Sequence, residues 1–127
     1  MSLNLNSLMI SSENPEKLVE FYTKVLGKPT WDMKPFTGWS VGSCGIMVGP
    51  HSEVHGKNDT PGRLIFFFET TDVKGEFDRI KGLGAEVVSE PAHPSGDTTD
   101  QKTMLACLAD PDGNYFQLAT PWEEPKE

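Results

Sequence analysis

Cysteine, basic side chains and long apolar runs are all scarce in this chain of 127 residues. The two cysteines, Cys44 and Cys107, stand far apart, which excludes a disulfide framework or zinc spacing and predicts two free thiols. Lys and Arg number 11 against 19 Asp and Glu, a formal net charge of −8, so no nucleic acid or membrane partner is expected. No apolar run reaches the ~18 residues of a membrane span, and no signal-peptide pattern opens the chain, so we expect a cytoplasmic protein.

The remaining composition, 36% hydrophobic and 24% charged, is typical of one globular domain covering residues 1–127. Its clearest element is a helix over 14–27, where Asn14 can cap the start, Pro15 suits the first turn and Gly27 ends it. A second helix is expected over 72–84. The predicted strands cover 5–11, 31–33, 38–41, 44–48, 63–70, 85–90, 102–109 and 114–120.

The order β-α-β-β-β therefore occurs twice, in a first module over about 3–50 and a second over 63–121, joined by a polar linker over 51–62. Each helix also carries Glu-Phe followed a few residues later by Leu-Gly. The repeated order and this short motif together indicate a duplication.

Two stretches then resemble the vicinal oxygen chelate superfamily, which includes glyoxalase I, bleomycin-resistance proteins and extradiol dioxygenases: NPEKLVEFYTKVLG (14–27) and DPDGNYFQL (110–118). The resemblance covers nearly the whole chain. It implies an α+β fold of two βαβββ modules whose curved sheets surround a cleft. It also implies a homodimer, because relatives often pair across a two-fold axis.

Metal-dependent members of that superfamily place ligands on the first and last strands of each module. Carried over, these positions fall on Ser7, Ile46, Ile65 and Gln117. A catalytic divalent metal needs about three imidazole or carboxylate ligands, and these four residues do not supply them. We therefore expect no metal and no cofactor, with the Gln117 amide either orienting a polar ligand group or only satisfying hydrogen bonds.

A rival metal set lies in HSEVH (51–55), where His51, Glu53 and His55 would share a face if the segment were a strand. Pro50 and Gly56 bracket it, which favours a solvated loop. His51 or Glu53 could also line the mouth of the cleft or act as a general base. His93 lies between two prolines in another predicted loop, and no role follows for it.

Aromatic residues suggest an apolar small-molecule site. If Ser7, Ile65 and Gln117 face the cleft, strand alternation brings Met9, Phe67 and Tyr115 to the same side. Trp31, Trp39 and Trp122 come from segments that border the cleft in this fold. We expect Trp39 and Tyr115 to contact a ligand. The sequence thus favours a metal-free protein that binds a small organic molecule, against a metal-dependent lyase, isomerase or dioxygenase with non-standard ligands.

Overall fold

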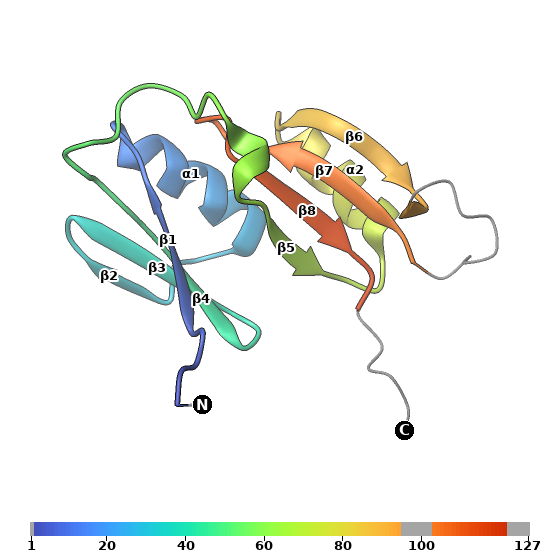
Figure 1. Cartoon of the computed structure of the whole chain (residues 1–127), viewed down its shortest axis with the longest axis horizontal. Coiled ribbons are helices and arrows are strands. Elements are labelled where there is room, and N and C mark those ends of the chain that lie inside the picture. The colour runs from blue at the N-terminus through green and yellow to red at the C-terminus, as the bar shows by residue number, and fades with distance from the viewer. Residues whose placement is uncertain (1, 95–102, 122–127) are drawn as a thin grey trace. The chain divides into compact units, whose positions relative to one another are not determined.

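The computed structural model describes residues 2–94 and 103–121, and it has the α+β architecture of two βαβββ modules (Figure 1). Each module contains one helix and one four-stranded mixed sheet. The first holds β1 (Ser7–Ser11), α1 (Pro15–Leu26), β2 (Trp31–Met33), β3 (Phe36–Val41) and β4 (Cys44–Gly49). The second holds β5 (Phe66–Glu69), α2 (Val73–Gly82), β6 (Glu86–Ala92), β7 (Leu105–Ala109) and β8 (Tyr115–Ala119). The predicted fold class is confirmed.

The two sheets have the same topology. Their strand orders are β1-β4-β3-β2 and β5-β8-β7-β6, with the first and last strands of each module paired in parallel and the other pairs antiparallel. In each module the helix covers one face of its own sheet and leaves the other face uncovered by that helix (Figure 1). We call the uncovered side the open face of each sheet.

Helix α1 buries Leu18, Phe21, Tyr22 and Val25, which recur at helical spacing on one side. Its start is fixed differently from the sequence expectation, because the Asn14 side chain makes no capping bond. Instead, the Ser12 hydroxyl accepts a hydrogen bond from the Asn14 backbone N–H at 3.0 Å.

The second module has the same hydroxyl contact at the start of α2. The Thr70 hydroxyl accepts from the backbone N–H of Asp72 at 3.0 Å, as Ser12 does from Asn14. Asp72 also caps its helix, since its carboxylate accepts from the Gly75 N–H at 3.0 Å. The matching contacts provide structural support for the duplication that the sequence indicates.

The chain divides into two compact units, residues 1–57 and 58–127. The division falls inside the predicted linker 51–62. This segment contains turns and, at its end, a short 3-10 helix, η1 (Pro61–Arg63). In the described part of the chain, no helix is long and apolar enough to cross a membrane.

Candidate functional site

The helix-covered face of the first sheet contains two residues that we had expected in the cleft. Trp39 pairs with Ile46 across β3 and β4, and directly opposite residues point to the same side of a sheet. The Trp39 indole Nε1 donates to the Gly27 carbonyl at 2.9 Å, and its ring lies 6.3 Å from that of Tyr22 on α1. Trp39 is 2% exposed and Ile46 is 6% exposed. Both therefore belong to the core under α1, and their expected place on the open face was wrong.

The internal repeat explains the error at Ile46. The Ser12 N–H donates to the carbonyl of Gly49, and the corresponding Thr70 N–H donates to that of Ala119. Gly49 and Ala119 are thus equivalent, so the residue two before each is equivalent as well. The counterpart of Gln117 is Met47, one residue past the predicted Ile46. A shift of one residue turns a strand side chain to the other face.

The open face of the first sheet carries Ser7 and Met9. Ser7 stands opposite Gly45, and Met9 stands opposite Met47. Met9 is 41% exposed. The two metal-ligand positions of this module are therefore Ser7 and Met47, which offer a hydroxyl and a thioether. These two groups do not form a ligand set for a catalytic zinc or iron.

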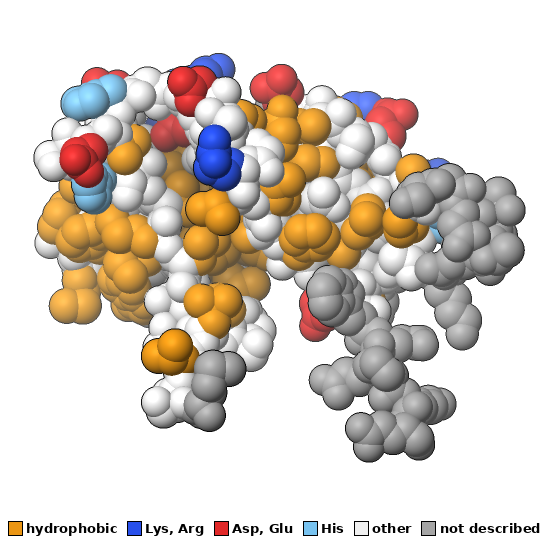
Figure 2. Space-filling model, in the orientation of Figure 1, with side chains coloured by type: hydrophobic (Ala, Val, Ile, Leu, Met, Phe, Trp, Pro, Cys, Tyr) orange, Lys and Arg blue, Asp and Glu red, His pale blue; other side chains and the backbone are white. Residues whose placement is uncertain are grey.

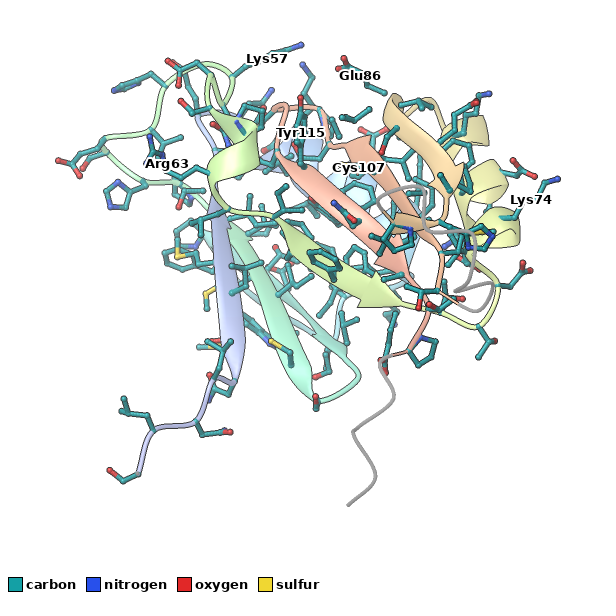
Figure 3. The ribbon with its side chains drawn as sticks, turned by 45° about the vertical axis from the view of Figure 1, so that its right-hand side comes forward. Lys57, Arg63, Lys74, Glu86, Cys107 and Tyr115 are labelled. Atoms are coloured by element: carbon teal, nitrogen blue, oxygen red, sulfur yellow. The ribbon has the colours of Figure 1, made fainter. Side chains whose placement is uncertain are left out.

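The open face of the second sheet carries Gln117 at the middle of β8. Phe67 of β5 stands opposite Gln117 on one side, and Cys107 of β7 stands opposite on the other. Tyr115 lies on the same face, two residues before Gln117, and Figure 3 shows it at the start of β8 with Cys107 on β7. Phe67 is 49% exposed, and Figure 2 shows apolar side chains gathered over this part of the sheet. Ile65 lies just before β5, outside the strand.

The side chain of Gln117 is unusual in its hydrogen bonding. Its Oε1 atom is buried and has no hydrogen-bond partner among the described residues. Burying an amide oxygen without a partner costs free energy of folding, about 1–3 kcal/mol. An amide can both accept and donate hydrogen bonds, so a polar group placed here would satisfy it.

The Cys107 thiol beside Gln117 has low reactivity. Cys107 is 4% exposed, and burial raises the pKa of its thiol above the ordinary value. A raised pKa keeps the sulfur protonated at neutral pH, whereas the thiolate is the form that attacks substrates and binds metals. The site therefore offers packing against Cys107, with no activated nucleophile at that position.

A tight turn positions β8 and hence Gln117. The Asp110 carboxylate is 4% exposed and accepts from the backbone N–H groups of Asp112 at 2.9 Å and Asn114 at 3.0 Å. Gly113 adopts a φ of 83°, which glycine tolerates and other residues rarely adopt. From the linker, the Asn58 side-chain amide donates to Asn114 Oδ1 at 3.0 Å. These bonds explain why the DPDGN sequence precedes the strand.

The HSEVH segment is a loop, so its three candidate ligands do not share a strand face. His51 Nδ1 accepts from the Glu53 backbone N–H at 3.1 Å. His55 Nδ1 lies 3.7 Å from Oε1 of Glu13, on the loop before α1. Within residues 2–94 and 103–121, no group of three His, Cys, Asp or Glu side chains is arranged to hold a metal ion.

Glu69, His93 and Trp122 differ in their relation to the site. Glu69 shares the open face with Phe67, two residues along β5, and sequence analysis missed it although strand alternation in FFFE implies it. His93 Nδ1 lies 2.7 Å from the Thr103 carbonyl, which gives this histidine a local structural partner. Trp122 lies outside the described residues.

Comparison with known proteins identifies the family. The profile of the glyoxalase-like domain matches residues 7–119. A solved structure described as a conserved domain protein has a TM-score of 0.74 at 24% identity and covers 94% of this chain and 100% of its own. A glyoxalase-related enzyme from Fulvimarina pelagi has a TM-score of 0.73 at 15% identity, with coverages of 93% and 88%. A glyoxalase/bleomycin resistance protein/dioxygenase family enzyme from Burkholderia phytofirmans PsJN has 0.72 at 18%, with 93% and 98%. No curated protein matches.

Proposed function

The chain belongs to the glyoxalase-like domain family, and we propose that it binds a small organic molecule without a catalytic metal. The observation that carries this proposal is the buried, unpartnered Oε1 of Gln117 between Phe67 and Cys107. The unpartnered Oε1 atom of Gln117 lowers the stability of the free protein. A ligand that donates a hydrogen bond to this atom would explain its presence.

The surroundings of Gln117 indicate the kind of ligand. Phe67 and Tyr115 provide aromatic rings on the same face, and a half-exposed ring can cover a flat molecule by stacking. The protein is acidic overall, and Glu69 adds a carboxylate on this face. Aromatic faces and nearby negative charge both attract cations. We therefore propose a planar or aromatic ligand, neutral or cationic, with a polar edge that reaches Gln117.

The proposal of a metal-free site rests on the chemistry of four side chains. With the register given by the internal repeat, the ligand positions of the superfamily are Ser7, Met47, Ile65 and Gln117. None of the four is an imidazole or carboxylate, which are the ligands a catalytic divalent metal needs. The donor set does not fit such a metal, and we derive no reaction step through one.

The alternative, a metal-dependent lyase, isomerase or dioxygenase, would need His51, Glu53 and His55 as ligands. Their loop geometry gives this alternative no support, since Nδ1 of His51 is engaged by a backbone N–H and His55 lies beside Glu13. Catalysis by Glu53 or His51 as a general base would require a substrate next to this exposed loop.

The test begins with thermal-shift screening of small aromatic compounds, including cations, followed by calorimetry on the wild type. Gln117→Leu should weaken binding of a hit by about 1–3 kcal/mol, because the polar group of the ligand loses its partner. The Ser89→Ala variant, which alters a hydroxyl farther along the same face, serves as the control. Equal affinity in the wild type and Gln117→Leu would mean that Gln117 is only a structural residue.

Elemental analysis tests the metal-free part separately. Protein purified without an affinity tag and exposed to zinc, nickel, iron or manganese should hold far less than one ion per chain. A tightly held ion near one per chain would overturn the proposal and favour the metal-dependent alternative.

A further inference from the structure

Asn58 ties the segment that leads into β5 to the turn that leads into β8. Its backbone N–H donates to the Asp112 carbonyl at 2.8 Å, and its side-chain Nδ2 donates to Asn114 Oδ1 at 3.0 Å. Both partners lie in the turn that ends at Tyr115, the first residue of β8. Asn58 is therefore held to this turn by its main chain and its side chain together. All of these residues belong to the second unit.

The same residue also shapes the chain on its way to β5. Asn58 Oδ1 accepts from the Thr60 N–H at 2.9 Å, and the Thr60 carbonyl accepts from the Arg63 N–H at 3.1 Å, at the end of η1. Two residues then separate Arg63 from the start of β5 at Phe66. Local hydrogen bonds thus run from the turn before β8, through Asn58, almost to the start of β5.

The β5–β8 pair needs support at this end, because no hairpin joins two parallel strands. In the first module, the equivalent β1–β4 pair begins with Ser7 opposite Gly45. By the internal repeat, the counterpart in the second module is Ile65 opposite Tyr115, but the β5–β8 pairing begins one residue later. Asn58 joins the two incoming segments at the end where the second pair is shorter.

We propose that Asn58 is a positioning residue that holds the start of β8 against the segment entering β5. Tyr115 directly follows Asn114, and Gln117 stands opposite Phe67 in the same pair. Loosening at the start of β8 would therefore change the spacing of the three side chains to which ligand binding is assigned. This bearing on ligand binding rests on the proposed function, whereas the positioning itself is a property of the ligand-free protein.

Two substitutions at Asn58 separate its contacts. Asn58→Asp keeps an oxygen that can accept from the Thr60 N–H but removes the donor to Asn114 Oδ1, and Asn58→Ala removes both side-chain contacts. Asp59→Ala is the matched control, since the neighbouring Asp59 carboxylate accepts from Thr60 Oγ1 at 3.1 Å within the linker. Asn58 and Asp59 are both exposed, so all three variants should keep the fold.

Hydrogen exchange of the ligand-free protein at neutral pH measures the effect. In both Asn58 variants, the protected amides within 66–68 and 115–117 should exchange about fivefold faster, because a hydrogen bond at this end of the pair is lost. The amides of α2 and of β1 should keep their wild-type rates. In NMR spectra the side-chain amide resonances of Gln117 should shift, while those of Asn6 in the first module stay in place. Asp59→Ala should match the wild type in each measurement.

Four results would overturn the inference. The first is unchanged exchange in both Asn58 variants, and the second is unchanged Gln117 side-chain resonances. The third is equal acceleration across β5, β8 and α2, because Asn58 would then act only on the overall stability of the module. The fourth is the same local change in Asp59→Ala, which would assign the effect to the linker in general. The measurements need no ligand, so a failure of the proposed function would leave this test intact.

Discussion

Gln117 of β8 and Cys107 of β7 are direct partners in the antiparallel pair, and both side chains lie on the open face of the second sheet. The thiol is 4% exposed, and the neighbouring Gln117 Oε1 is buried without a partner in the described part of the chain. An amide oxygen buried at such a place without a partner lowers stability, and a ligand group that donated a hydrogen bond to it would offset this cost.

The first prediction is that Gln117→Leu stabilises the ligand-free protein. Replacing the amide by an apolar group of similar size removes an unsatisfied buried acceptor, so the free energy of unfolding should rise by about 1 kcal/mol. Chemical denaturation at neutral pH measures the change. Gln117→Glu should act in the opposite direction, because a carboxylate at this position is partly buried without a counter-charge. A less stable Gln117→Leu protein would show that the amide contributes to folding.

The second prediction concerns the register of β4. Ile46 lies under α1 and is 6% exposed, whereas Met47 lies on the open face. Ile46→Glu should therefore lower the free energy of unfolding by more than about 3 kcal/mol, since it buries an unpaired charge. Met47→Glu should cost about 1 kcal/mol or less. Urea denaturation of the two neighbouring variants compares them directly, and the reverse order of stability would restore the original assignment of Ile46.

The fold could be predicted because its signals are local. Pro15, the apolar spacing through Tyr22 and Val25, and Gly27 specify the first helix, and the same order of elements recurs in the second half. The DPDGN turn fixes the register of the last hairpin, so Tyr115 and Gln117 could be placed on one face. Strand ends were less accurate, as β5 begins at Phe66 and β7 at Leu105, because tertiary pairing decides where a strand stops.

The errors at Ile46 and Trp39 have different physical causes. The ligand position of β4 was placed by counting from distant motifs, and the apolar residues of β4 fall on both faces. An error of one residue there reversed the predicted faces of the strand. Trp39 was placed by its aromatic character alone, whereas the bond from its indole to Gly27 and its packing on Tyr22 depend on contacts far apart in sequence.

The third prediction concerns pH. Glu13 Oε2 accepts a hydrogen bond from the Gly56 backbone N–H at 2.9 Å, and this bond, followed by the nearby His55, lowers the pKa of the carboxyl below its ordinary value. A carboxyl whose pKa is depressed in the folded state contributes stability above its unfolded pKa, and this contribution is lost as pH falls through the folded pKa. The contact that ties the 51–57 loop to the segment before α1 should therefore loosen in acid.

NMR titration of the Glu13 carboxyl, together with hydrogen exchange at the Gly56 amide, measures this effect. At neutral pH, Glu13→Ala should speed exchange at Gly56, because the amide loses its acceptor. Glu53→Ala, which removes a carboxylate from the same exposed loop, is the matched control. A Glu13 carboxyl that titrates at or above its ordinary pKa would contradict the role assigned to this bond.

The fourth prediction is that the protein forms a homodimer. β5 is an edge strand of its sheet, and it is preceded by Leu64, 80% exposed, and carries Phe67, 49% exposed. Exposed apolar side chains gathered at a sheet edge favour association, and two-fold dimers are the commonest closed assembly. Light scattering at high micromolar concentration should give the mass of two chains, and Leu64→Ser should shift the equilibrium toward monomer. Leu83→Ser, which removes a 39% exposed leucine at the end of α2, should not. A wild-type monomer at that concentration would refute the dimer. A dimer that both variants leave intact would place the interface on another surface.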